Sequence, residues 1–160
     1  MLASLPPAHA TPAPVVRYGF NKSQLGETLT VWRSSAPAGV TCSAAGAVTT
    51  CTAPLVPLGG GYVARNLTYR FVNGELARIN FHTSIDAFSW VRSRIDTRFG
   101  DPARVVRNNI AADSVDFPHV RDVWRNGRST IMVDDPSPDM STLRVTYTLD
   151  SLASALPAAS

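Results

Sequence analysis

The clearest structural signal in this chain is Leu67-Thr68-Tyr69-Arg70-Phe71-Val72-Asn73-Gly74-Glu75-Leu76-Ala77-Arg78-Ile79-Asn80-Phe81. Apolar and polar residues alternate on both sides of Asn73-Gly74, a preferred pair for a two-residue turn between antiparallel strands. Because successive side chains of a strand point to opposite faces, the pattern predicts a hairpin with one buried face. The residues expected on that face are Leu67, Tyr69, Phe71, Ala77, Ile79 and Phe81.

A second hairpin is expected in the C-terminal half of the chain. Residues 120–133 are rich in β-formers and have Asn126-Gly127 at their centre. Residues 143–148 predict a last strand, whereas residues 103–119 show no regular pattern and are expected to be loosely ordered. Residues 151–160 are expected to form a flexible C-terminal tail.

Two helices are expected, one before each hairpin. Asn21 is a suitable N-cap with Gln24 three residues later, and Leu25, Leu29 and Trp32 then recur at helical spacing until Ala36-Pro37. The second helix should begin at Thr83, with Asp86 as its capping partner, and end at Gly100-Asp101-Pro102. Its expected apolar face consists of Ile85, Phe88, Val91, Ile95 and Phe99.

These elements predict an α+β fold in which an antiparallel sheet, built from Asn-Gly hairpins, packs against two helices. Helix followed by hairpin occurs twice, which suggests a pseudo-repeat, although an ordinary α+β domain without internal repetition fits the pattern as well. The chain has 160 residues, of which 44% are hydrophobic, enough for one buried core. Residues 15–150 are therefore expected to form a single domain.

The two cysteines and the N-terminus indicate an oxidising compartment. Cys42 and Cys51 bracket a short hairpin with Ala45-Gly46 at its turn and are expected to form a disulfide, which persists outside the reducing cytosol. Ala8-His9-Ala10 has the form of a signal-peptidase site. Residues 1–14 are thus either the remnant of a signal peptide or an Ala/Pro-rich disordered tail, and the expected location is periplasmic or secreted. No stretch approaches the ~20 apolar residues of a membrane span.

Charge and motif composition disfavour several function classes. The 15 basic and 12 acidic residues give a net charge of +3, without the dense basic stripe of a nucleic-acid-binding protein. His9, His82 and His119 lack metal-ligand spacing, and the acidic segment 134–139 is better explained as a proline-rich turn than as a calcium loop. No cofactor motif and no set of catalytic residues is identified, so neither a cofactor nor a metal is expected and catalysis is disfavoured.

The segment from Leu67 to Leu76, with its Tyr-x-Phe-x-Asn-Gly-x-Leu pattern, resembles the small exported domains grouped around the β-lactamase inhibitor protein and the small lipoprotein of the outer-membrane barrel assembly machinery. Phe99-Gly100-Asp101-Pro102 before the second hairpin adds to the likeness. The chain has no lipid-anchoring cysteine, which separates it from the lipoprotein. The resemblance implies a non-catalytic protein-binding module that uses the open face of an antiparallel sheet.

Strand alternation gives an independent indication of a binding surface. The positions that face away from the predicted core include Arg70, Arg78, Arg121, Arg125 and Arg144. Arginine offers a planar fork of donors for carboxylates and phosphates, so this surface would suit an acidic partner. Tyr62 and His82 are candidate contributors at its edges. The alternative interpretation is that these arginines only solvate the exposed side of a half-covered sheet.

The sequence therefore leaves two hypotheses for the function. The leading hypothesis is an exported binding module, such as an inhibitor, an immunity-type protein or an envelope accessory protein, that presents its arginine-bearing sheet face to an acidic protein surface. The alternative is a small periplasmic hydrolase or ligand-binding domain with His82 near its site. Neither nucleic acid nor a membrane span is expected, and the oligomeric state is left open.

Overall fold

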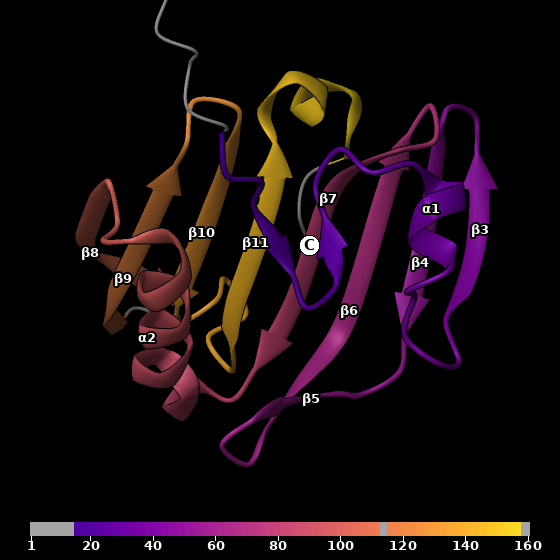
Figure 1. Ribbon diagram of the computed structural model, residues 1–160. Helices are drawn as coiled ribbons and strands as arrows, with labels where there is room; N and C mark the ends of the chain where they lie inside the picture. Colours follow the sequence, from indigo (N-terminus) through magenta and orange to yellow (C-terminus); the bar gives the residue numbers. More distant parts are fainter. Residues whose placement is uncertain (1–14, 113–114, 158–160) are drawn as a thin grey trace, which may run out of the picture.

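The computed structural model describes residues 15–112 and 115–157, and an antiparallel sheet of nine strands dominates it (Figure 1). The strands lie in the order β3-β4-β6-β7-β11-β10-β9-β8, and β5 pairs separately with β6. The elements are β1 (Gly19–Phe20), β2 (Ser23–Gln24), α1 (Leu29–Arg33), β3 (Thr41–Ala45), β4 (Val48–Ala53), β5 (Val56–Gly59), β6 (Tyr62–Val72), β7 (Glu75–Thr83), η1 (Ile85–Ala87), α2 (Phe88–Phe99), β8 (Arg104–Ala112), β9 (Val115–Arg125), β10 (Ser129–Asp135), β11 (Leu143–Leu149) and η2 (Asp150–Ala155).

The sheet consists of two meanders that meet at its centre. One runs inward from β3 to β7 and the other from β8 to β11, and the antiparallel pair β7–β11 joins them. A helix precedes each meander, although α1 has 5 residues and α2 has 12. The two Asn-Gly turns are not equivalent, because Asn73-Gly74 joins the last two strands of its meander and Asn126-Gly127 the middle two of the other. The two halves thus share an order of elements but not their turns, and a pseudo-repeat stays a prediction.

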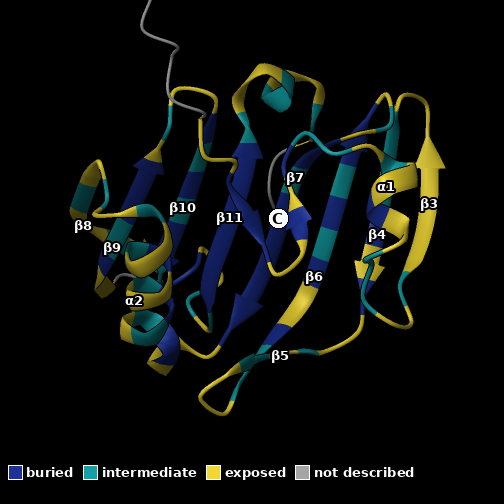
Figure 2. Ribbon diagram, viewed as in Figure 1, coloured by how far each residue is buried: buried dark blue, intermediate teal, exposed yellow. Residues whose placement is uncertain are grey.

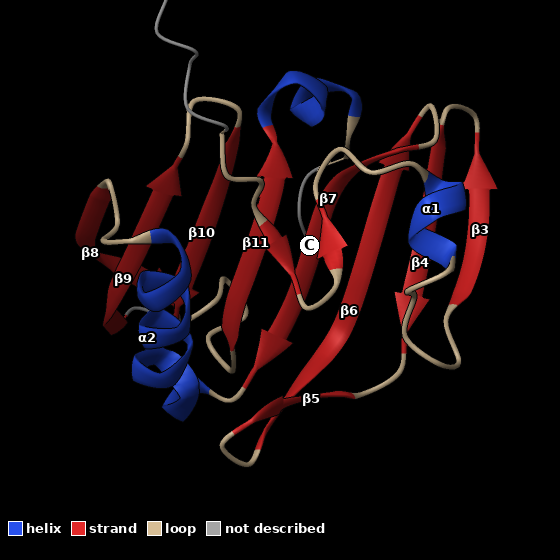
Figure 3. Cartoon of the chain, viewed as in Figure 1, coloured by secondary structure: helices blue, strands red, loops and turns tan. Residues whose placement is uncertain are grey.

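One face of the sheet carries the hydrophobic core. The helices and the N-terminal hairpin β1–β2 lie on this face (Figures 1 and 3), and the central strands are buried while β3 is exposed (Figure 2). All six side chains expected on the core face of the first hairpin are buried. A bulge between Arg70 and Phe71 pairs Phe71 with Leu76, so Leu76 joins the core cluster and Ala77 does not. The turn itself is confirmed, since Asn73 (φ 50°) and Gly74 (φ 80°) are both left-handed.

The expected first helix is wrong over most of its length. Asn21 (φ 53°) lies in the turn between β1 and β2, and the helix begins only after Thr28, whose hydroxyl accepts a hydrogen bond from the Val31 amide at 3.3 Å. The backbone of the intervening segment bonds to the sheet instead, with the Gly26 amide donating to the Leu76 carbonyl at 2.9 Å. These bonds replace those that a helix would make, so α2 is the one substantial helix among the described residues.

The second helix is confirmed in its centre and at its end. It begins with the short 3₁₀ turn η1, and Thr83 does not cap it because its buried hydroxyl has no hydrogen-bond partner among the described residues. Val91 and Ile95 are buried against the sheet, and Gly100 (φ 84°) ends the helix. Ile85 is exposed and does not belong to the buried face.

The C-terminal half contains one strand more than expected. Residues 104–112, expected to be loose, form β8 and pair with β9 along their whole length. The Asn126-Gly127 hairpin and the last strand are confirmed. Residues 150–155 form η2 at the start of the segment expected to be a flexible tail, and the Pro157 carbonyl accepts a hydrogen bond from Arg78 at 2.7 Å. Residues 158–160 and the segment 1–14 lie outside the described residues.

The predicted disulfide joins Cys42 to Cys51, which are directly opposite each other on β3 and β4. The hairpin turns at Gly46-Ala47, one residue later than expected, because Ala45 pairs with Val48. Cys51 is buried in the core cluster, whereas β3 is the exposed outermost strand. The disulfide thus fixes an edge strand to the sheet. Within the described chain, no helix is long and apolar enough to cross a membrane.

Reduction of this disulfide should lower stability without abolishing the fold, because the central strands and α2 form the core independently of β3. The chain-entropy model gives a loss of about 2.5–3 kcal/mol in the free energy of unfolding for a loop of roughly ten residues. Urea denaturation with and without reductant measures the difference. Loss of all cooperative unfolding at room temperature would contradict a peripheral role for the disulfide.

Candidate functional site

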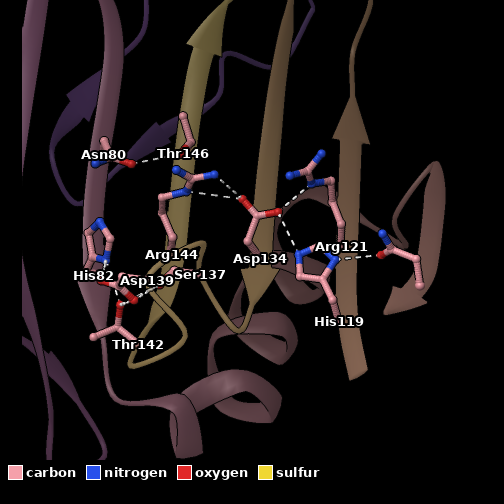
Figure 4. A network of polar contacts seen from close by, with 11 residues as sticks. Asn80, His82, His119, Arg121, Asp134, Ser137, Asp139, Thr142, Arg144 and Thr146 are labelled. Carbon is pink, nitrogen blue, oxygen red and sulfur yellow. Dashed lines mark hydrogen bonds and ion pairs between the residues drawn. The ribbon is translucent and has the colours of Figure 1, made fainter. Parts of the chain in front are cut away.

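A row of polar side chains crosses the face of the sheet that is opposite the helices. Strand register pairs His82 with Arg144, Arg144 with Asp134, and Asp134 with Arg121. The four residues come from β7, β11, β10 and β9, and they lie side by side because each is directly opposite the next (Figure 4). We call this side of the sheet the outer face.

Asp134 is the centre of this row. Its side chain is fully buried, and it accepts hydrogen bonds from Arg121 Nε at Oδ1 and from Arg144 Nη2 at Oδ2, the latter at 2.9 Å. His119 Nε2 lies 3.5 Å from Oδ1, and His119 Nδ1 lies 2.8 Å from the side-chain oxygen of Asn108 on β8. Charge-assisted bonds of this kind hold both guanidinium groups in defined positions. One carboxylate therefore orders two arginines and links three strands, and His119 extends the network to β8, as Figure 4 shows.

A groove of about 510 Å³ lies beside Asp134 on β8, β9 and β10. Apolar side chains, Val106, Ile110, Val123 and Met132, line it together with the three arginines Arg104, Arg121 and Arg125 and the polar residues Asn108 and His119. At the tip of the β8–β9 hairpin, Phe117 is directly opposite Ile110 on the same face, and 40% of it is exposed. We call this surface the arginine groove. It combines a basic end, a polar middle and an apolar tip.

The opposite part of the outer face also carries positive charge. Arg70 and Arg78 are directly opposite each other on β6 and β7. Burial lowers the pKa of the Arg78 guanidinium, and the positive charges of Arg70 and Arg144 lower it further. Its Nε atom is buried without a hydrogen-bond partner among the described residues. Like charges directly opposite each other destabilise a sheet, so this pair is a local cost to stability.

The predicted site residues thus divide into groups. All five predicted arginines lie on the outer face: Arg121 and Arg125 line the arginine groove, Arg144 is bound to Asp134, and Arg70 and Arg78 form the like-charged pair. Tyr62 is not with them, since its ring packs 5.8 Å from that of Trp90 and its hydroxyl donates to the Asp86 carbonyl at 3.3 Å. A binding role for these residues remains a prediction.

The contacts of the His82 side chain are structural. Its Nδ1 lies 2.8 Å from the Thr142 hydroxyl and 4.0 Å from Asp139 Oδ2, so both groups meet the same ring nitrogen. A relay of nucleophile, base and orienting acid would need the two partners on different nitrogens of the ring. Asp139 also accepts hydrogen bonds from Ser137 and Ser141 within its own loop. His82 therefore connects β7 to the loop that joins β10 and β11.

Three residues of the site were not predicted. Arg104 belongs to β8, whose sequence shows no regular alternation of apolar and polar residues, so only the pairing with β9 places it on the outer face. His119 and Asp134 also had no local signal, because only the register of the strands brings them together. Among residues 15–112 and 115–157, no group of three or more His, Cys, Asp and Glu side chains is arranged to hold a metal ion.

Comparison with known proteins finds no matching family model, and no curated protein or solved structure matches the chain. The resemblance based on the first Asn-Gly hairpin therefore remains a prediction.

Substituting Asp134→Asn should lower the free energy of unfolding by about 3–5 kcal/mol, because the buried guanidinium of Arg144 then loses its counter-ion. Chemical denaturation measures this, and Asp116→Asn, at an exposed position of the neighbouring strand β9, is the control. Equal stability of the two variants would show that the ion-pair network contributes little to stability.

Asp139 should make stability depend on pH in the acidic range. Hydrogen bonds, chiefly from Ser137 and then from the Ser141 amide, lower its pKa from 3.8 to about 2. A carboxyl group with a lower pKa in the folded state stabilises the protein above the unfolded-state pKa and loses this contribution as the pH falls to the folded-state value. Asp139→Asn should therefore be less stable than the parent at pH 7 and equal to it near pH 2, with a small difference because half of the side chain is exposed. Urea denaturation across this range tests the prediction, and an equal deficit at both ends would contradict it.

Proposed function

We propose that this protein is an exported, non-catalytic binding module whose arginine groove binds an acidic surface of another protein. The observation that carries the proposal is the excess of positive charge on the outer face. At the described outward positions of β7 to β11, Arg78, Arg104, Arg121, Arg125 and Arg144 are accompanied by one carboxylate, Asp134. An acidic partner supplies the charge that the face lacks.

The cost of this charge supports a role beyond stability. Arg70 and Arg78 repel each other across the first hairpin, and a neutral pair at these positions would stabilise the sheet more. Proteins retain such locally unfavourable arrangements at functional sites. A surface that only needed solvation would distribute both signs of charge over these strands.

The chemistry of the groove favours a protein as the partner. Arginine, methionine and aromatic side chains are enriched in protein interfaces, and Met132 lines the groove while Phe117 extends it. A partner that placed a carboxylate between Arg104 and Arg125 and an apolar side chain against Phe117 would use both ends of the surface. Nucleic acid would need a longer continuous track of positive charge.

The proposed location outside the cytosol is supported by the Cys42–Cys51 disulfide, because such bonds persist in oxidising compartments. The resemblance to small exported inhibitors and envelope accessory proteins agrees with the same location and with binding through an open sheet face. An inhibitor, an immunity-type protein and an envelope accessory protein all fit this description.

The proposal is tested by comparing the proteins that the parent chain and a double variant, Arg104→Glu with Arg125→Glu, capture from an envelope extract. Both arginines are exposed, so the variant should fold, and reversal of their charge should weaken binding of the partner at least tenfold. Quantitative mass spectrometry of the bound fraction, followed by titration with the purified partner, measures the loss.

Arg33→Glu on α1 is the control, because it makes the same type of substitution, at one position instead of two, on an exposed part of another element. It should capture the partner as the parent does. Equal capture by the groove variant and the control would contradict the proposal.

A further inference from the structure

A second cavity, of about 380 Å³, lies on the helix-bearing face of the sheet, between α2, β1 and β5. This volume is at the lower end of the ~300–1,000 Å³ that is usual for small-molecule sites. The cavity is on the other side of the sheet from the arginine groove, and no residue lines both. The residues that line this cavity are therefore considered separately from those of the arginine groove.

Aromatic side chains form the interior of this cavity. The ring of Phe20 lies 4.6 Å from that of Phe81 and 6.3 Å from that of Tyr147, centroid to centroid. Trp90 of α2 and Leu58 of β5 complete the lining. A Cβ atom on Gly60 would lie 2.7 Å from Trp90 Nε1, so only a glycine there lets the β5–β6 turn pack directly on the indole. The backbone of the β5–β6 turn therefore fixes the position of the Trp90 indole at this side of the cavity.

Two arginines of α2, Arg94 and Arg98, also line the cavity. Their guanidinium carbons lie 5.0 Å from the ring centroids of Trp90 and Phe99 respectively, and among the described residues neither has a carboxylate within 4.0 Å. Arg92, on the same helix, pairs with Asp122 at 3.3 Å and Asp96 at 3.6 Å. Arg94 and Arg98 are one turn apart and repel each other, which makes α2 less stable. The positive charge at the cavity is thus left without a counter-ion.

Tyr147 provides a further polar group. It is 5% exposed, and it lines the cavity. Burial raises the pKa of this phenol well above its usual value, and the positive charge of Arg98 opposes the rise. The phenol is therefore protonated at neutral pH and can donate a hydrogen bond to an anion near Arg98.

We propose that this cavity binds a small organic carboxylate with an apolar body, the carboxylate lying between Arg94, Arg98 and the Tyr147 hydroxyl and the body on Phe20, Phe81 and Trp90. The aromatic lining disfavours a fully polar anion such as phosphate, since the rings of Phe20, Phe81 and Trp90 offer such an ion apolar surface. The two arginines exclude a cationic amphiphile. The ligand class follows from this combination, and it does not depend on the arginine groove.

Decanoate, below its critical micelle concentration, is the probe, and the tryptophan fluorescence of the full chain reports binding. Trp90 lines the cavity, whereas Trp32 and Trp124 are buried and do not line it, so a saturable change should be seen that Trp90→Phe removes. Decanol and decylamine should bind at least tenfold more weakly than decanoate, because they lack the negative charge.

The double variant Arg94→Gln with Arg98→Gln should weaken decanoate binding at least tenfold, and Tyr147→Phe should weaken it severalfold. Arg125→Glu, in the arginine groove, should leave it unchanged, so a failure of the proposed protein-binding function does not affect this result. Absence of a saturable signal with decanoate, equal binding of decylamine, or unchanged binding by the double variant would overturn the proposal.

Discussion

The antiparallel pairing of β7 with β11 is the contact on which the rest of the structure depends. It joins two meanders that would otherwise be separate sheets, and its register places His82 opposite Arg144 and Asn80 opposite Thr146. A shift by one residue would exchange the two faces of the C-terminal half. Val145 and Tyr147, which are directly opposite Phe81 and Ile79, would then leave the core, so burial of these apolar side chains fixes the register and, with it, the polar row on the outer face.

The outer face contains both a buried ion-pair network that joins its strands and a set of exposed arginines. Asp134 gives Arg121 and Arg144 a shared counter-ion, which fixes the strands β9, β10 and β11 to one another. The other arginines of this face extend from the like-charged pair on β6 and β7 to the arginine groove. The buried ion pair is the structural part of the surface, and the exposed arginines around it are the part that we propose to contact a partner.

The sequence predicts best the elements whose signals are local. Both Asn-Gly hairpins, the last strand, the centre of α2 and the disulfide all depend on residues within a short stretch of chain. The first helix failed because Gly26 and its neighbours bond to the backbone of β7, a contact no local pattern shows. Asp134 was missed for the same reason, since its partners lie on β9 and β11 and only strand register brings them together. Tyr62 was placed with the arginines although the β5–β6 turn directs it toward Trp90.

The central claim is that the outer face of β8, β9 and β10 is the surface that recognises a partner. Hydrogen–deuterium exchange of the chain, alone and in complex with its captured partner, tests it most directly. We expect slower exchange on binding in residues 104–111 and 115–125, with no change in β3 or α2. Slower exchange confined to β3, β4 or α2 would contradict it.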